Sequence, residues 1–138
     1  MTDTSATEAT TDGRELRSVR TRRAIIDALL LLIDEGDLAP TARQVAEQAG
    51  VGLRTVFQHF EDLEVLHIEA ATRHIERIAP LLVTVSSQGP SQQRIDAMVR
   101  MRSKLFERIT PVRRAVLNAE FRFETLANLI RVDRKSVV

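Results

Sequence analysis

The chain of 138 residues contains no cysteine. Disulfide bonds and a zinc finger are therefore excluded as supports of its fold. Long apolar runs are missing too, because the longest, residues 28–33, is far shorter than the roughly 20 residues that span a bilayer. The first residues, MTDTSATEATTDG, are polar and acidic without an apolar centre, so they do not form a signal peptide. We expect a cytoplasmic protein with no membrane partner.

The residue patterns of an enzyme are also lacking. The sequence shows no pattern of a nucleophile with a neighbouring base and no glycine-rich phosphate loop. It also shows no pair of carboxylates in a sequence context typical of catalytic acids. His59, His67 and His74 are the candidates for metal ligation, but no carboxylate or thiol completes a set of ligands around His67 and His74. We therefore expect a protein that is not an enzyme and has no catalytic residue, metal or cofactor.

Lysine is scarce, since arginine outnumbers it eighteen to two. Arginine suits bidentate contacts with phosphate or guanine, although a coding bias of the source genome is the simpler explanation. The net charge of +1 is unevenly distributed. Residues 24–76 hold three arginines against ten acidic residues, whereas basic residues dominate in 14–23 and 94–135. Any nucleic-acid contact in the acidic stretch would depend on a few placed side chains, because broad neutralisation of phosphates is not available there.

Apolar residues recur at helical spacing along the chain, and no segment alternates as a strand would, so the predicted fold class is all-α. The expected helices span about residues 18–35, 42–49, 53–60, 61–79 and 92–109, with a last helix starting at Pro111. Residues 1–17 are expected to be a disordered leader. In the first helix, Val19, Ile26, Leu30 and Ile33 are predicted to face the core.

The span TARQVAEQAGVGLRTVFQHF, residues 41–60, predicts two short helices joined by a tight turn. Thr41 can cap the first helix, and Gln44 completes a Thr-x-x-Gln capping box. Gly50 can adopt the left-handed conformation that ends a helix. The second helix turns Val56 and Phe60 inward. Its other faces carry the polar side chains Arg54, Thr55, Gln58 and His59. This is the pattern of a helix-turn-helix, whose second helix enters the major groove of DNA.

Residues 18–78 resemble the N-terminal domain of the TetR family of transcriptional regulators. Four elements carry the resemblance in register: a first helix ending in glycine (RSVRTRRAIIDALLLLIDEG), a capping Thr five residues later, an Ala-Gly-Val turn, and an aromatic-x-His-Phe sequence (FQHF) that closes the recognition helix. The resemblance implies a three-helix DNA-binding domain over residues 18–78. It also implies a partial helical domain for ligand binding and dimerisation over residues 79–138.

Double-stranded DNA is the partner that the resemblance implies. The residues implied to contact it are Arg22, Arg23, Thr41, Arg43, Leu53, Arg54, Thr55, Phe57, Gln58 and His59. Thr41 and Arg43 would meet the phosphate backbone at the start of the second helix, and Arg22 and Arg23 would add phosphate contacts. Arg54 would read guanine, because its guanidinium matches the O6 and N7 acceptors of that base.

Three positions depart from the family pattern. Phe57 replaces a frequent Tyr, Leu63 a usual Lys, and Gly52 a common Ser. Each change removes a group that would contact phosphate or cap the recognition helix, which indicates weaker or more selective DNA binding.

The chain is shorter than is usual in the family, whose last two helices pair across a twofold axis. Two interpretations follow. The first is a dimeric repressor that binds a palindromic operator and is released by a small-molecule effector; it would form a homodimer if the missing C-terminal helices are supplied or replaced. The second is a truncated interaction protein that binds DNA weakly and acts by pairing with another chain. A related choice concerns Met98, Met101 and Phe106, which either pack in a core or line a ligand cavity.

Overall fold

Helices are the only regular secondary structure in the part of the chain that the computed structural model describes, residues 5–120, 122, 123 and 128. They are α1 (Ser5–Asp34), α2 (Ala42–Ala49), α3 (Leu53–His59), α4 (Leu63–Ile78), the 3₁₀ turn η1 (Ala79–Leu81) and α5 (Ser91–Glu120). The predicted all-α fold is confirmed. No helix among these residues combines the length and the apolar character needed to cross a bilayer.

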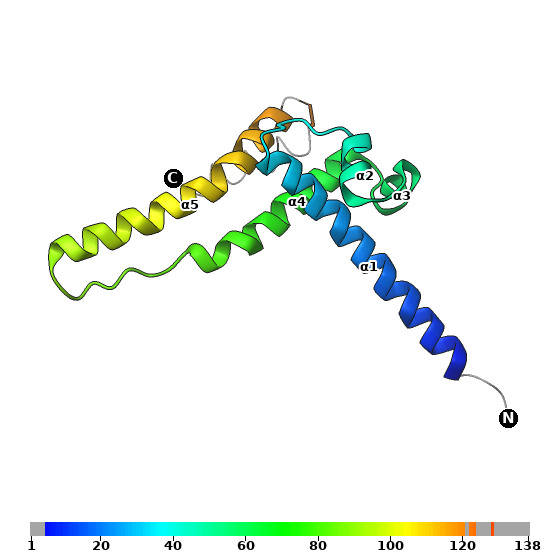
Figure 1. The fold of residues 1–138 in the computed structure, drawn as a ribbon, viewed down its shortest axis with the longest axis horizontal. Coiled ribbons are helices and arrows are strands. Elements are labelled where there is room, and N and C mark those ends of the chain that lie inside the picture. Colours follow the sequence, from blue (N-terminus) through cyan, green and yellow to red (C-terminus); the bar gives the residue numbers. More distant parts are fainter. Residues whose placement is uncertain (1–4, 121, 124–127, 129–138) are drawn as a thin grey trace.

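The helices meet around the C-terminal half of α1 (Figure 1). There α2 and α3 pack at one side of α1 and α4, while the N-terminal half of α1 projects away from the other helices. From this region α4 runs outward, and α5 returns toward it after the loop of residues 82–90. In this loop Gly89 has a φ of 98°, a conformation that glycine adopts without a steric penalty.

One apolar core joins all the long helices. In α1 its most deeply buried members are Ile25, Leu29 and Leu30. The remaining helices and the residue that follows α3 contribute Val45, Ala46, Val56, Phe60, Leu66, Ala70, Val112 and Ala115. Because α5 supplies two of these residues, the helix-turn-helix region shares its core with the segment beyond residue 79. Burial of this apolar surface is the main favourable term in the folding of the chain.

Helix α1 differs from the prediction in two ways. It begins at Ser5, so the expectation of a disordered leader over residues 1–17 does not hold for 5–17; residues 1–4 lie outside the described residues. The segment contains no proline, so no residue in it blocks the backward extension of the packed half of the helix, although Gly13 and its Ser, Thr and Asp residues are weak helix formers. Val19, predicted to face the core, is 54% exposed because it borders an open groove between α1 and α4.

Helix α5 was predicted to break at Thr110 and Pro111, but it continues to Glu120. A proline within a helix removes one backbone hydrogen bond and usually kinks or ends the helix. Here Val112 and Ala115, one and four residues after the proline, are buried in the core, and tertiary packing overrides the local preference. The Thr110 hydroxyl also donates to the Phe106 carbonyl at 2.6 Å.

The outward part of α5 is largely uncovered. Met98 and Phe106 are 40% and 56% exposed, so neither lies in a core or an enclosed cavity. Of the three residues considered for that role, Met101 is half-buried and borders a surface groove with Leu81 and Val83. The later apolar residues of the predicted last helix, Phe121, Leu126 and Leu129, fall outside the described residues.

His67 on α4 is buried in the packed region and is 5% exposed. Its ring lies 5.4 Å from that of Phe123, centroid to centroid. Burial, with the nearby charge of Arg122, lowers the pKa of His67 from 6.5 to about 4. The imidazole is therefore a neutral part of the fold. In the described part of the chain no three His, Cys, Asp or Glu side chains are placed to hold a metal ion.

The free energy of unfolding is expected to fall as the pH drops from 6.5 toward 4. In that window the unfolded chain binds a proton at His67 and the folded chain does not, so acid favours unfolding; the loss is complete below about pH 4, where both states are protonated. Urea titrations of the parent chain and of His67→Gln at pH 7.5 and 4.5 would measure this loss of unfolding free energy. If the two chains lost the same stability between these pH values, His67 would not be the titrating group.

Candidate nucleic-acid interface

The start of α2 is held by the predicted capping box. Thr41 has an extended backbone, its hydroxyl oxygen accepts from the Gln44 N–H at 3.3 Å, and its own N–H donates to the Gln44 side chain at 2.8 Å. The Thr41 hydroxyl also donates to that side-chain oxygen at 2.9 Å. Thr41 is exposed, but its hydroxyl already has partners within the protein, so a phosphate at this helix start would have to share or replace them.

The turn between α2 and α3 depends on Gly50. Its φ of 69° and ψ of 31° lie in the left-handed region, as predicted, and its N–H donates to the carbonyls of Ala46 and Glu47. The Val51 N–H donates to the Ala46 carbonyl at 3.0 Å, and the Val51 side chain packs against the core. Gly52 then begins α3 without any side-chain cap. These contacts set the angle at which α3 leaves α2.

Helix α3 has one buried and one exposed face. Val56 and, directly after the helix, Phe60 are each 1% exposed and anchor it to the core. The opposite side carries Leu53, Arg54, Phe57 and Gln58, which are all exposed. Arg54 and Gln58 are four residues apart and so lie on one helical face with Phe57 between them. Thr55 and His59 are half-buried at the border of the two faces.

The exposed face of α3 offers a mixed set of groups to a partner. Arg54 makes no ion pair with any residue that the structure describes, so its guanidinium is available for an outside acceptor. Leu53 and Phe57, 39% and 49% exposed, add apolar surface suited to thymine methyl groups or sugar edges. Arg43 on α2 is exposed as well. Few cationic side chains therefore lie on or near this face, which agrees with the acidic composition of residues 24–76.

Arg22 is placed differently from the predicted phosphate contact. Its guanidinium makes a bidentate ion pair with the Glu69 carboxylate of α4, donates to the backbone carbonyl of His59, and lies 4.2 Å from the centre of the Phe60 ring. These contacts tie α1 and α4 to the C-terminal end of α3. Arg22 therefore holds the orientation of the candidate recognition helix through contacts at His59 and Phe60, at the end of the helix that is anchored to the core.

Arg23, the other predicted phosphate ligand on α1, is exposed. It borders a groove whose other lining residues all come from α1 and α4, among them Glu69, Arg73 and Glu76. The structure thus groups Leu53, Arg54, Phe57 and Gln58 on one face and places Arg22 and Arg23 near Glu69. The part played by Glu69 was missed, because 47 residues separate it from Arg22 and no local pattern links them.

Arg22→Ala is expected to lower the free energy of unfolding by about 1–2 kcal/mol, because the ion pair, the bond to the His59 carbonyl and the stacking on Phe60 are lost together. The estimate is modest because both charged side chains are about a third exposed and solvent screens them. Urea unfolding would measure the loss, with Arg23→Ala as control, expected within about 0.5 kcal/mol of the parent. Equal losses in the two variants would argue against the orienting role of Arg22.

Comparison with curated proteins finds a relative in Xanthobacter autotrophicus, described as an uncharacterized HTH-type transcriptional regulator in the dhlA 5' region. The two sequences are 32% identical over 91 residues. The match covers 66% of this chain and 44% of the relative, so the chain matches less than half of that protein's length. No family profile and no solved structure matches the chain.

Proposed function

We propose that this protein is a DNA-binding transcriptional regulator of the TetR type, acting in the cytoplasm as a repressor and not as an enzyme. The observation that carries the proposal is the arrangement of α3: Val56 and Phe60 anchor it, and Leu53, Arg54, Phe57 and Gln58 face outward. A short anchored helix whose exposed face carries both polar and apolar side chains, set by a glycine turn against α2, suits insertion into the major groove. The description of the Xanthobacter relative as an HTH-type regulator agrees with it.

The proposed roles follow the placement of the side chains. Leu53, Arg54 and Thr55, at the start of α3, meet base edges, and Phe57, Gln58 and His59 lie along the groove and its backbone. Thr41 and Arg43 contact phosphate at the start of α2. Arg23 adds charge near the backbone, whereas Arg22 holds α3 in place. In this proposal residues 18–78 form the DNA-binding domain, and residues 79–138 belong to a domain for dimerisation and effector binding.

A twofold homodimer on a palindromic operator completes the proposal. Two copies of α3 would then occupy successive major grooves, about 34–36 Å apart, one turn of the double helix. The exposed apolar side chains of α5, Ile95, Met98, Val99 and Phe106, offer surface for a second chain. A small effector that binds better to an arrangement of the helices that does not fit the operator would release the protein from DNA.

The alternative is an interaction protein that binds DNA weakly and pairs with a different chain. The same exposed apolar residues of α5 favour it, together with Leu82 and Val83 in the preceding loop, which are 62% and 61% exposed. An acidic balance over residues 24–76 also opposes nonspecific attraction to DNA.

Fluorescence anisotropy with a labelled duplex from the upstream region of the gene distinguishes the two functions. The regulator is expected to bind that duplex at least a hundredfold more tightly than a shuffled duplex of the same composition, across a series of salt concentrations. Sedimentation of the same samples would show two chains per operator. Equal affinity for both duplexes would contradict the regulator and favour the interaction protein.

A further inference from the structure

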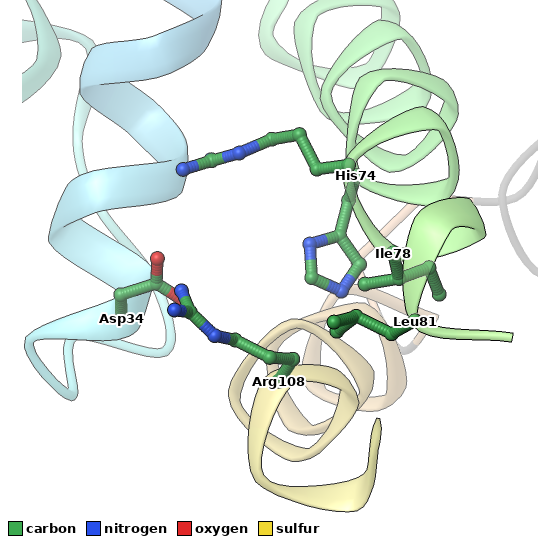
Figure 2. Close-up of a pocket in the computed structure, with 6 residues that line it drawn as sticks. Asp34, His74, Ile78, Leu81 and Arg108 are labelled. Atoms are coloured by element: carbon green, nitrogen blue, oxygen red, sulfur yellow. The ribbon is translucent and has the colours of Figure 1, made fainter. Parts of the chain in front are cut away.

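A small cavity lies where α1, α4 and α5 meet, apart from the exposed face of α3. Its volume is about 190 Å³, and its lining residues are Asp34, His74, Arg77, Ile78, Leu81 and Arg108. Figure 2 shows Arg108 reaching from α5 toward Asp34 at the end of α1, while the His74 ring enters the same space from α4. The cavity is thus built from α1, α4, the turn η1 and α5.

The charges that line this cavity are not balanced. Arg77 and Arg108 make no ion pair with any residue in the described part of the chain, and Asp34 is the single acidic group in the lining. By contrast, Arg73, one turn earlier on α4, pairs with Asp27 at 3.2 Å and Glu76 at 3.7 Å. Two cations against one anion leave the cavity with one uncompensated positive charge, which suits a ligand carrying one negative charge.

His74 adds a polar atom without a partner. Its Nε2 is buried and makes no hydrogen bond. The pKa of His74 is lowered, chiefly by burial and also by Arg77, with Asp34 acting in the opposite direction. A buried ring nitrogen with no partner costs free energy unless something supplies the missing hydrogen bond. A ligand oxygen in the cavity would provide it.

The remaining wall is apolar. Ile78 and Leu81 line the cavity beside His74 (Figure 2). A cavity of about 150 Å³ is known to accept benzene, so this volume holds a ligand of about six non-hydrogen atoms. These lining residues suit a ligand with a negatively charged group facing the two arginines and a short hydrocarbon tail facing Ile78 and Leu81.

We propose that this cavity binds a small organic monocarboxylate, with its carboxylate held by Arg77 and Arg108, an oxygen within reach of His74 Nε2, and its short tail against Ile78 and Leu81. The bound molecule touches α1, α4 and α5 together. Binding does not require that the chain recognise DNA, so the test below is made on the full chain without DNA, and its failure would leave the proposed regulatory function untouched.

The test is calorimetric titration and thermal unfolding with sodium butyrate at constant ionic strength. Butyrate is expected to bind and to raise the unfolding temperature as its concentration rises. Butyramide, which has the same size but no charge, is expected to bind at least tenfold more weakly, since the charge-assisted hydrogen bonds are lost. Inorganic phosphate, which has no tail, is expected to bind more weakly than butyrate as well.

Variants locate the site. Arg108→Gln and Arg77→Gln are each expected to weaken butyrate binding about tenfold or more. Arg102→Gln removes the same charge from an exposed position of α5 outside the cavity, and this variant is expected to bind butyrate as the parent chain does. Circular dichroism of each variant shows whether it is folded, and the two cavity variants serve as independent tests.

Three results would overturn the proposal: the absence of butyrate binding at millimolar concentration, equal binding of butyrate and butyramide, or equal loss of binding in Arg102→Gln and the cavity variants. Binding of phosphate as tight as that of butyrate would overturn the assignment to a carboxylate with an apolar tail.

Discussion

Phe60→Ala is expected to lower the free energy of unfolding by about 3–5 kcal/mol, because a fully buried aromatic side chain is replaced by a cavity. Phe60 is 1% exposed and belongs to the core that joins α1, α2, α3 and α4. Its ring also supports the Arg22 guanidinium, so truncation removes a packing partner and the surface on which Arg22 lies. Such a loss is a large fraction of the total stability of a domain.

Phe57→Ala is the matched control for this experiment. The two phenylalanines are three residues apart, but Phe57 is 49% exposed, so its truncation is expected to cost less than about 1 kcal/mol. Urea unfolding followed by circular dichroism would give both values. If the two variants lost the same stability, Phe60 would not be the anchor of α3, and the exposed face assigned to that helix would be wrong.

Arg54→Ala is expected to weaken binding to the specific operator by about 1–3 kcal/mol, roughly 5- to 150-fold, and to relax the preference at one base pair. Arg54 is exposed on α3, and no described residue pairs with it. Its planar guanidinium can donate two hydrogen bonds to the O6 and N7 of guanine. Because Arg54 is exposed, its loss should leave the stability of the chain within about 0.5 kcal/mol of the parent value.

Two further variants separate base reading from charge. Arg54→Lys keeps the positive charge but not the bidentate fork, so it is expected to keep most nonspecific affinity and lose the base preference. Arg102→Ala removes one charge from α5, far along the chain from α3, and should leave the base preference intact. Anisotropy with operators changed at single positions would reveal these effects. An unaltered base preference in both Arg54 variants would mean that Arg54 is not a reader of sequence.

The loss of Arg22 should affect DNA in a different way from the loss of Arg54. Arg22 lies behind α3, with its guanidinium held by Glu69, the His59 carbonyl and the Phe60 ring. A variant of Arg22 would therefore weaken binding to every operator sequence alike, since the helix and not one base contact is disturbed. This distinguishes a side chain that orients the recognition helix from one that reads a base.

Local features of the structure were accessible from the sequence because short-range hydrogen bonds and backbone conformation decide them. The capping box of Thr41 and Gln44 and the left-handed turn at Gly50 each involve residues no more than a few positions apart. The inward positions Val56 and Phe60 followed from helical spacing. The all-α class followed for the same reason, as the 3.6-residue period is a property of the backbone.

Only the tertiary structure decided which helix face meets a neighbour and which charges find partners. Val19 fits the apolar stripe of α1 but borders an open groove and stays exposed, and Pro111 fits a break but lies beside residues that packing holds in a helix. Arg22 has the charge of a phosphate ligand, yet it meets Glu69 only because α1 and α4 are folded together. Burial and ion pairing depend on residues far apart in the chain, and a local sequence pattern does not show which distant residues become neighbours in the fold.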